Sequence, residues 1–383
     1  MKIALVNKVF SLSHGGLERF SVNLAVTLQG AGHEVHVFGQ SFSGLPEGIV
    51  LHLLPDTGKS FLGGLLKFHR LASRAIGKGR FDIVLGLTRF YPMDVYRMGD
   101  GLQRHWMRIC YPFLPWRWFN YLVNTAHAAN LYLERKILSG GVRRIITNSR
   151  LCKEQVCKYY KFPEENVEVV YNGVDHSLFH SDARPAWRST IRKELGLGAE
   201  DIALLHVSNN WQRKGLETTL KAMAAMGQSG ERMHLIVAGR GKVEIFRRLA
   251  GHLGLEKRIH FIGSCTQMER YYAAGDLLVL PTLYDPFSNV CLEAMACGLP
   301  VVTTAANGAS EILVEGETGY VQKDPKDMQE LAQILEKCLD STALLRMGEA
   351  ARRDSEAFTL GRNMQQILEV FEKVVAEKTR FSR

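Results

Sequence analysis

The sequence predicts an α/β protein with two doubly wound domains, each built around a parallel β-sheet. At 383 residues the chain is longer than one hydrophobic core usually accommodates. Short apolar segments alternate with helical segments along both halves, which is the pattern of a parallel sheet covered by helices. A hydrophobic content of 46% with 23% charged residues is ordinary for a globular protein.

Five strands are predicted in each half, with segments of helical periodicity between them. The first set comprises Ile3–Val6, Glu34–Phe38, Ile83–Gly86, Ile145–Thr147 and Val167–Tyr171. The second set comprises Ala203–Val207, His234–Ala238, Ile259–Ile262, Leu277–Leu280 and Val301–Thr303. Polar segments at Asn172–Asp175 and His180–Pro185 separate the two sets and predict the joint between the domains.

Neither a membrane span nor a signal peptide is expected from the sequence. No run of eighteen apolar residues occurs, and the segment Met1–Val6 lacks a small-residue cleavage site, so it is interpreted as the first strand. The seven cysteines form no C-x-x-C pair and mostly lie in apolar surroundings. Free thiols in a reducing compartment are the simplest interpretation.

Positive charge is concentrated in the N-terminal half. Residues 1–180 contain 22 Lys and Arg against 13 Asp and Glu, whereas residues 181–383 contain 26 of each. The whole formal net charge of +9 therefore belongs to the first half. This asymmetry favours an anionic partner for that half, and a membrane surface, a phosphorylated acceptor and nucleic acid all fit.

The segment Tyr284–Thr304 carries the clearest functional signal. Asp285 precedes a proline and is expected outside a helix, while Ser288 is a good N-cap and Gly298 closes the helix that follows. Free amides at the start of this helix, which form an anion site, belong to Asn289, Val290 and Cys291. Glu293 adds a second carboxylate in the first turns. A ligand with both phosphate and hydroxyl groups fits this combination, and a nucleotide sugar is the obvious candidate.

This segment resembles the signature of glycosyltransferase family 4, in which two glutamates are separated by seven residues. The resemblance implies that Asp285 contacts the donor sugar and that Glu293 holds the ribose hydroxyls of the nucleotide. Asp285 departs from the family glutamate and is one methylene shorter. The resemblance covers nearly the whole chain and implies the GT-B fold, in which two Rossmann-like domains face each other across a cleft. Open α/β sheets bind ligands beyond the carboxyl ends of their strands, which agrees with such a site.

The segment His14–Arg19 follows the first strand and opens the first helix. Gly15 and Gly16 let the backbone approach a ligand closely, and the helix dipole favours negative charge there. The resemblance implies that this loop faces the donor phosphate and the acceptor, with the two glycines at the donor and Glu18 at the acceptor. A tight strand-to-helix turn needs glycine anyway, so the motif is informative only beside the signature of the second half.

Arg213 and Lys214 follow the first strand of the second half. Their charges suit the negative charge that develops on a leaving nucleoside diphosphate. Family members usually place an arginine five positions before this lysine, where the chain has Asn209. The resemblance assigns Arg213 and Lys214 to donor binding and, with Asp285 and Asp100, to catalysis. Further donor contacts are assigned to Ile262, Ser288, Asn289 and Val290.

No metal and no cofactor other than the nucleotide-sugar substrate is expected. No D-x-D triplet, the metal-binding signature of the other common glycosyltransferase fold, occurs in the chain. His33 and His36 have a ligand-like spacing, but they lie in the strand-like segment Gly32–Gly39, where positions three apart face opposite sides. Gly239 and Gly241 form only half of a dinucleotide fingerprint, because Glu244 occupies the place of the third glycine.

The segment Asp94–Asp100 indicates which subgroup of the family the chain resembles. Many family members carry a histidine here, whereas this segment resembles the lipopolysaccharide core glucosyltransferases that add glucose to an inner-core heptose. In that subgroup an aspartate stands at the equivalent of Asp100. The resemblance implies that Asp100 accepts a hydrogen bond from the acceptor hydroxyl or orients the donor sugar. A loop aspartate that caps a turn is the alternative interpretation.

An aromatic and basic segment, Arg104–Tyr121, follows directly and contains three of the five tryptophans. Amphipathic aromatic side chains between arginines suit the headgroup region of an anionic bilayer, and the resemblance also implies membrane contact here. The residues assigned to membrane or acceptor contact are Arg104, Trp106, Arg108, Trp116, Arg117 and Trp118. A wall that stacks on acceptor sugars and a core under a loop are the alternatives. No nucleic-acid module accompanies the segment, so nucleic acid is not expected as a partner.

Together these features predict a metal-independent, retaining glycosyltransferase that moves a hexose, glucose from UDP-glucose, to an inner-core heptose of lipopolysaccharide. Retention is implied by the family alone. The expected location is cytoplasmic, peripheral on the inner face of the cytoplasmic membrane. The predicted domains are residues 1–178 for the acceptor, 179–358 for the donor, and 359–383 as a helix that the resemblance places back on the first domain. The alternatives are another nucleotide sugar used on a lipid-linked or capsular glycan, and a non-catalytic nucleotide-sugar-binding scaffold.

Overall fold

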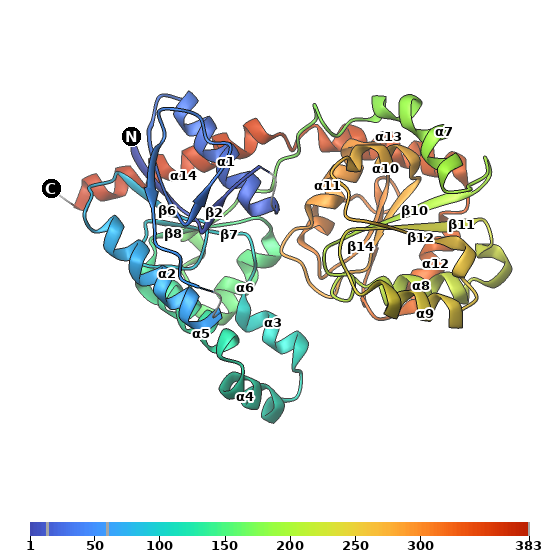
Figure 1. The fold of residues 1–383 in the computed structure, drawn as a ribbon, viewed down its shortest axis with the longest axis horizontal. Coiled ribbons are helices and arrows are strands. Elements are labelled where there is room, and N and C mark those ends of the chain that lie inside the picture. The colour runs from blue at the N-terminus through green and yellow to red at the C-terminus, as the bar shows by residue number, and fades with distance from the viewer. Residues whose placement is uncertain (13–14, 59–60, 382–383) are drawn as a thin grey trace. The chain divides into compact units, whose positions relative to one another are not determined.

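The computed structural model describes residues 1–12, 15–58 and 61–381, and it confirms the predicted α/β class. The chain divides into two compact units, each with its own parallel sheet (Figure 1). Unit 1 comprises Met1–Tyr171 together with Asn363–Arg383, and unit 2 comprises Asn172–Arg362. His14, which belongs to the predicted glycine-rich loop, lies outside the described residues.

Unit 1 is centred on a seven-stranded parallel sheet. Its strands are β1 (Lys2–Val6), β3 (Glu34–Gly39), β5 (Val50–Leu53), β6 (Ile83–Gly86), β7 (Val95–Met98), β8 (Arg144–Thr147) and β9 (Val167–Val169). They lie in the order β5-β3-β1-β6-β7-β8-β9. Two short strands, β2 (Val9–Phe10) and β4 (Ser41–Phe42), form a separate parallel pair.

Different helices cover the two faces of this sheet. The helices of unit 1 are α1 (Gly16–Gly30), α2 (Phe61–Ile76), α3 (Gln103–Cys110), α4 (Leu114–Val123), α5 (Thr125–Lys136), α6 (Arg150–Tyr160) and most of α14 (Leu360–Phe381), with short helical turns at Ile137–Gly141 and Glu164–Asn166. α1 and α14 pack on one face, and α2 and α6 pack on the other (Figure 1). Along β1, Ile3 and Leu5 point into the first core, whereas Ala4 and Val6 point into the second. A central strand buried on both sides must be apolar at every position, which is why this segment is easily recognised in the sequence.

Unit 2 repeats the plan with six parallel strands. They are β10 (Ile202–Val207), β11 (Met233–Ala238), β12 (Ile259–Gly263), β13 (Leu277–Leu280), β14 (Val301–Thr304) and β15 (Gly319–Gln322). Their order is β12-β11-β10-β13-β14-β15. β10 therefore lies in the middle of the sheet, next to β13.

Helices cover both faces of this second sheet as well. They are α7 (Arg184–Glu194), α8 (Leu216–Ala225), α9 (Val243–His252), α10 (Met268–Ala274), α11 (Asn289–Ala296), α12 (Met328–Lys337) and α13 (Ser341–Ser355), with short helical turns at Ser181–Ala183, Gly227–Gly230, Glu256–Arg258 and Gly308–Ile312. α8, α9 and α12 share one core with the strands, and α10 and α11 lie over the other face (Figure 1). α10 also packs against α7, and α11 packs against α13.

Each of the ten predicted strands coincides with an observed one, with ends that differ by no more than two residues. Three strands of the main sheets, β5, β7 and β15, were not predicted. β5 is a short edge strand whose side chains are largely exposed, although three of its four residues are apolar. β7 contains the buried Arg97, whose guanidinium lies 3.6 Å from the ring centroid of Phe20. Because this residue is charged, the apolar run of the strand is interrupted and the strand is hard to recognise in the sequence.

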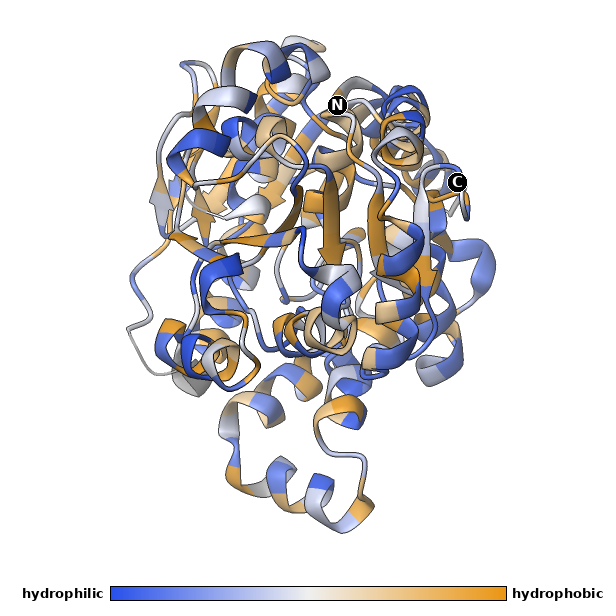
Figure 2. Cartoon of the chain, turned by 90° about the vertical axis from the view of Figure 1, so that its right-hand side faces the viewer, coloured by the Kyte–Doolittle hydropathy of each residue, from blue (hydrophilic) through white to orange (hydrophobic). Residues whose placement is uncertain are grey.

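Hydropathy follows this layering. In Figure 2 the strands are predominantly hydrophobic, whereas the helices carry hydrophobic and hydrophilic residues side by side. This is expected when strands are buried between two helical layers and each helix has one face in water. In unit 1, α3 and α4 extend beyond α5, away from the strands (Figure 1).

Candidate functional site

Two loops of unit 2 meet because the strands before them are neighbours. β10 and β13 are paired in parallel, so the segments that follow them emerge at the same edge of the sheet. Arg213 and Lys214 lie in the loop after β10, and Asp285 lies in the loop after β13. The two loops are joined directly, since the amide of Leu283 donates to the carbonyl of Arg213 over 2.8 Å. The topology thus brings these three charged residues of the sequence analysis together.

Asp285 is the centre of an ion cluster. Its Oδ2 accepts hydrogen bonds from Nζ of Lys214 at 2.5 Å and from Nη1 of Arg213 at 3.0 Å. Lys214 also donates to Oγ of Ser288, and Arg213 donates to the carbonyl of Tyr284 over 3.0 Å. The exposed fraction is 7% for both Lys214 and Asp285. Burial of a single charge is costly, so each of these two stabilises the other in its ionised form.

The backbone around Asp285 is held by Asn307, a residue that the sequence analysis did not select. The amide of Asp285 donates to the carbonyl of Ala306, and the amide of Gly308 donates to the carbonyl of Asp285, both over 3.0 Å. The fully buried side chain of Asn307 accepts from the amide of Ser288 over 3.1 Å. Asn307 therefore orders the entry to α11. It follows the apolar strand β14 in an Ala-Ala-Asn-Gly turn, which is the only signal in the sequence that marks it.

Electrostatics keep the Asp285–Lys214 pair charged. Burial alone would raise the pKa of Asp285, but the ammonium of Lys214 and the guanidinium of Arg213 outweigh it and lower the pKa below its ordinary value of 3.8. Burial lowers the pKa of Lys214 from its ordinary value of 10.5, and Asp285 opposes part of that change. The contact between the two groups thus favours the ionised form of each. Of the two, only the lysine can lose its charge as the pH rises.

The pH dependence of catalysis is expected to show the deprotonation of Lys214. A cation that stabilises a developing negative charge acts only while it is protonated, and the pKa of Lys214 lies below 10.5. We therefore expect kcat/KM to fall on the alkaline side at a pH below that value. In Lys214→Arg the guanidinium stays protonated, so the fall should move to higher pH. Identical alkaline limbs in the wild type and Lys214→Arg would assign the titration to another group.

The start of α11 differs in detail from the prediction. Ser288 is the N-cap residue, as expected, but its side chain makes no capping bond, because its hydroxyl accepts from Lys214. The amide of Cys291 is not directed outward, since it donates to the carbonyl of Ser288 over 3.0 Å. Asn289 is exposed, and its Oδ1 accepts from Nδ2 of Asn172 over 2.6 Å, while Val290 is half-buried. The N-terminal end of α11 thus offers Asn289 and Val290 rather than all three predicted amides.

Glu293 lies one turn into α11 and is half-buried. Its Oε2 accepts a hydrogen bond from the hydroxyl of Tyr272 on α10 over 2.9 Å. Tyr272 is a second residue that the sequence analysis missed, because nothing in the sequence separates it from its neighbour Tyr271.

Two other positions named in the sequence analysis lie at or just beyond the ends of strands of unit 2. Ile262 is in β12, one residue before its end, and is half-buried. Asn209, where the family usually has arginine, follows β10 and accepts from the amide of Arg240 over 3.2 Å. Asn209 therefore connects the loops that follow β10 and β11 instead of contributing a charge.

The glycine-rich loop of unit 1 begins α1. Gly15 is the N-cap residue in an extended conformation, and Gly16 is the first residue of the helix. A Cβ atom added at Gly15 would lie 2.7 Å from the carboxylate of Glu18, which is half-buried in the first turn. The backbone at Gly15 thus lies close to an acidic side chain as well as to the positive end of the helix dipole.

Asp100 is exposed in the loop that follows β7. Two arginines flank it, and the sequence analysis named neither. Burial lowers the pKa of Arg97 to about 10, although the charge of Asp100 opposes this change. Arg89 donates from Nη2 to the carbonyl of Gly101 over 3.0 Å and lies 3.8 Å from a carboxylate oxygen of Glu134. Asp100 therefore lies in a strongly basic environment at the carboxyl end of the sheet.

The arginines of the aromatic segment are engaged within unit 1. Arg104 donates to the carbonyl of Tyr159 over 2.8 Å, and the guanidinium of Arg108 lies 4.6 Å from the ring centroid of that tyrosine. Arg117 donates to the carbonyls of Tyr111 and Pro112. These three side chains therefore also stabilise the fold of the segment.

Unlike these arginines, most aromatic side chains of α4 and of the residue before it are exposed. Trp106 on α3 is half-buried, whereas Trp116 and Trp118 on α4 are 56% and 61% exposed. The other large exposed hydrophobic side chains here belong to Phe113, Leu114, Phe119 and Val123. We call Phe113–Val123 the aromatic helix. Exposed apolar residues grouped on one short element are typical of an interaction surface.

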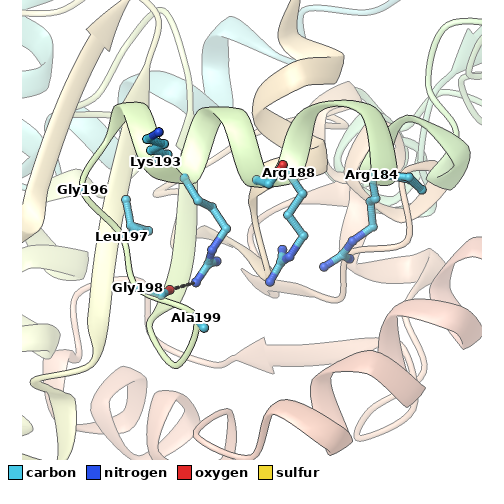
Figure 3. A pocket seen from close by; sticks show the side chains of 10 residues that line it. Arg184, Arg188, Lys193, Gly196, Leu197, Gly198 and Ala199 are labelled. Carbon is cyan, nitrogen blue, oxygen red and sulfur yellow. Dashed lines mark hydrogen bonds between the residues drawn. The ribbon is translucent and has the colours of Figure 1, made fainter.

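A basic pocket lies at the opposite edge of the sheet of unit 2 and has a structural explanation. Arg184 and Arg188 point from α7 toward the lower side of that helix in Figure 3. Arg188 and Arg192 bind Asp276, which directly precedes β13, over 2.7 and 3.0 Å. Arg188 also donates to the carbonyl of Ala274 at the end of α10. These arginines hold α10 in place.

Among the described residues, no helix is both long and apolar enough to cross a membrane. Within the same ranges, no group of three or more His, Cys, Asp or Glu side chains could hold a metal ion.

Comparisons with known proteins agree with the geometry. The family model for glycosyl transferases group 1 matches residues 188–354, and that for Glycosyltransferase Family 4 matches residues 14–178. The lipopolysaccharide glucosyltransferase WaaG of Escherichia coli K12 is 26% identical over 337 residues, which make up 86% of this chain and 87% of WaaG.

Solved structures show the same fold. The crystal structure of WaaG has a TM-score of 0.82 at 23% identity and covers 96% of this chain and 99% of its own. The structure of HepE from Anabaena in complex with UDP-glucose has a TM-score of 0.74 at 22% identity and covers 97% and 100%. At these identities the structural likeness shows the fold alone, which is the predicted GT-B fold.

Proposed function

Because the chain is a glycosyltransferase of family 4, we propose that it transfers glucose from UDP-glucose to an inner-core heptose of lipopolysaccharide, with retention and without a metal ion. In this proposal unit 2 binds the donor and unit 1 binds the acceptor. The names of two similar proteins support the substrates, since WaaG is a lipopolysaccharide glucosyltransferase and HepE was solved with UDP-glucose.

The observation that carries the proposal is the ion cluster of Arg213, Lys214 and Asp285 beside the start of α11. Cleavage of the bond between the sugar and the phosphate leaves negative charge on the diphosphate, and fixed cations stabilise that charge in the transition state. Arg213 uses Nη1 for both of its bonds in the cluster, and a guanidinium offers five N–H donors in all. Lys214 supplies a compact charge, while Asp285 keeps both cations in place and contacts the sugar.

The remaining roles follow from position. The carboxylate of Glu293, held by Tyr272, is suited to accept hydrogen bonds from the ribose hydroxyls. Asp100 binds the acceptor hydroxyl, and the neighbouring Arg97 and Arg89 suit an acceptor that carries acidic groups.

A panel of UDP- and GDP-sugars, assayed with EDTA and heptose-terminated core lipid, tests the donor and the metal independence together. Transfer from UDP-glucose with EDTA present is the expected result. Transfer from a different donor would support the reaction type but would show that the enzyme contributes to the synthesis of another glycan. Activity that EDTA abolishes and Mg²⁺ restores would contradict the metal-independent mechanism.

We further propose that the aromatic helix contacts an anionic membrane surface, where the lipid-linked acceptor resides. Its exposed Trp and Phe side chains supply the amphipathic groups that favour the headgroup region. The excess of Lys and Arg in residues 1–180 favours attraction to anionic lipids.

Replacement of Trp116 and Trp118 by glutamate is expected to lower binding to phosphatidylglycerol vesicles at least tenfold, since each buried aromatic ring contributes roughly 1.5–3 kcal/mol. Co-sedimentation at several salt concentrations measures this. Ile245→Glu combined with Leu345→Glu is the matched control, because these residues of unit 2 are 56% and 57% exposed. Equal binding by the wild type and the tryptophan variant would remove the aromatic helix from membrane contact.

A further inference from the structure

We propose that Tyr272 is a positioning residue for nucleotide binding, because it fixes the carboxylate that receives the ribose. The inference rests on the proposed function, in which Glu293 holds the ribose hydroxyls. The hydroxyl of Tyr272 donates to Oε2 of Glu293 over 2.9 Å. This bond joins α10 to α11, which a strand and a loop separate in the chain. A partner of this kind orients a ligand-binding side chain in the same way that outer residues orient metal ligands.

Tyr272 is itself held in place from several sides. It is 0% exposed, and its ring packs edge-on against Phe179 with centroids 5.8 Å apart and an interplanar angle of 83°. The end of α10 is tied to α7, because Arg188 donates to the carbonyl of Ala274 over 3.2 Å. The hydroxyl therefore has a fixed position before any ligand arrives. A carboxylate oriented by a fixed donor loses less conformational freedom when it binds a ligand.

The chemistry of the bond favours a donor role at every working pH. Burial and the charge of Glu293 hold the pKa of Tyr272 well above its ordinary value of 10.0, so the hydroxyl stays protonated. A hydrogen bond from a neutral hydroxyl to a carboxylate is charge-assisted and stronger than one between neutral groups. Phenylalanine keeps the ring that packs against Phe179 and removes only the donor.

The test compares nucleotide binding by Tyr272→Phe and the wild type in isothermal titration. UDP, GDP and ADP are all measured, so that the result depends neither on uracil nor on the acceptor. We expect Tyr272→Phe to weaken the best nucleotide about tenfold, the size of one charge-assisted hydrogen bond. The loss should vanish for the same nucleotide without its ribose 2′ and 3′ hydroxyls. It should also vanish in the Glu293→Ala background, because the two residues act as one unit.

Two further variants separate positioning from simple support of the fold. Tyr271→Phe, at the preceding position of α10, is the matched control and should bind as the wild type does. Phe179→Leu loosens the ring of Tyr272 and keeps its hydroxyl, so it should cause a smaller loss that again requires the ribose hydroxyls.

Four results would overturn the inference. Wild-type affinity in Tyr272→Phe overturns the inference and leaves the proposed function intact. An equal loss for the nucleotide without ribose hydroxyls, or an additional loss in the Glu293→Ala background, shows that Tyr272 only supports the fold and also overturns the inference. A wild-type protein that binds none of the three nucleotides overturns the inference and the proposed function together.

Discussion

Lys214→Met is expected to lower kcat for glucose transfer by a factor of about 10²–10³, the usual cost of removing one group that stabilises developing charge. Methionine occupies a similar volume but carries no ammonium to place near the diphosphate. Asp285 keeps its bond to Arg213 over 3.0 Å, so the loss of folding stability should stay near 1–3 kcal/mol, roughly that of one buried hydrogen bond. The enzyme should therefore remain folded at the assay temperature. Steady-state kinetics and thermal unfolding of the same preparation measure the two effects.

Lys221→Met is the matched control for this variant. Lys221 lies on α8 of the same unit, its side chain is 42% exposed, and it pairs with Glu217 one turn away. Exposed pairs of this kind contribute little, so kcat should be unchanged. Lys214→Arg should recover part of the lost activity, because it restores the charge with a different shape. A Lys214→Met enzyme within tenfold of the wild type would show that the ion cluster serves the fold and not the reaction.

Gly215→Ala is expected to cause a large loss of stability. Gly215 has a φ of +78°, and a Cβ atom there would lie 2.0 Å from the carbonyl oxygen of Pro281. The left-handed conformation costs about 1–2 kcal/mol for alanine, and the steric clash adds about 1–3 kcal/mol. Pro281 belongs to the loop that leads to Asp285, so relief of the clash moves the two loops apart. Urea denaturation measures the free energy of unfolding.

Gly254→Ala is the matched control, because it measures the cost of the left-handed backbone conformation without a steric clash. Gly254 has a φ of +69°, and an added Cβ atom there meets nothing within 4 Å. The free energy of unfolding should therefore fall by only about 1–2 kcal/mol. Equal losses in the two variants would mean that the loops adapt to a side chain at Gly215 without cost.

Much of the fold could be predicted because its strands are buried on both faces. Runs such as Ala203–Val207 and Leu277–Leu280 are apolar at almost every position, and a parallel sheet requires this. The same criterion missed β7, where Arg97 is buried and stacks on Phe20. β5, a short strand at the edge of the sheet, was not predicted either, although its residues are mostly apolar. Such strands are stabilised by particular neighbours that a single sequence does not display.

Residues of the candidate site could be predicted only where they belong to a short, recognisable sequence motif. Asp285 and Glu293 share one short segment that resembles a family signature, and Arg213 and Lys214 follow the first predicted strand of the second half. The contacts that orient these residues come from elsewhere in the chain. Asn307 reaches Ser288 across 19 positions because the loops after β14 and β13 lie at the same edge of the sheet. Tyr272 reaches Glu293 across 21 positions because α10 and α11 lie over the same face of the sheet. An asparagine after a strand and one of two adjacent tyrosines are too common to be chosen without the fold.

The most direct test of the central claim is the structure of the product formed from UDP-glucose labelled with ¹³C and heptose-terminated core lipid in the presence of EDTA. Nuclear magnetic resonance identifies both the sugar transferred and the configuration of the new bond. We expect a labelled glucose in α-linkage to heptose, which retains the configuration of the donor. A β-linked product would contradict retention. A wild-type enzyme that transfers no glucose to this acceptor, while it uses another nucleotide sugar, would contradict the proposed substrates.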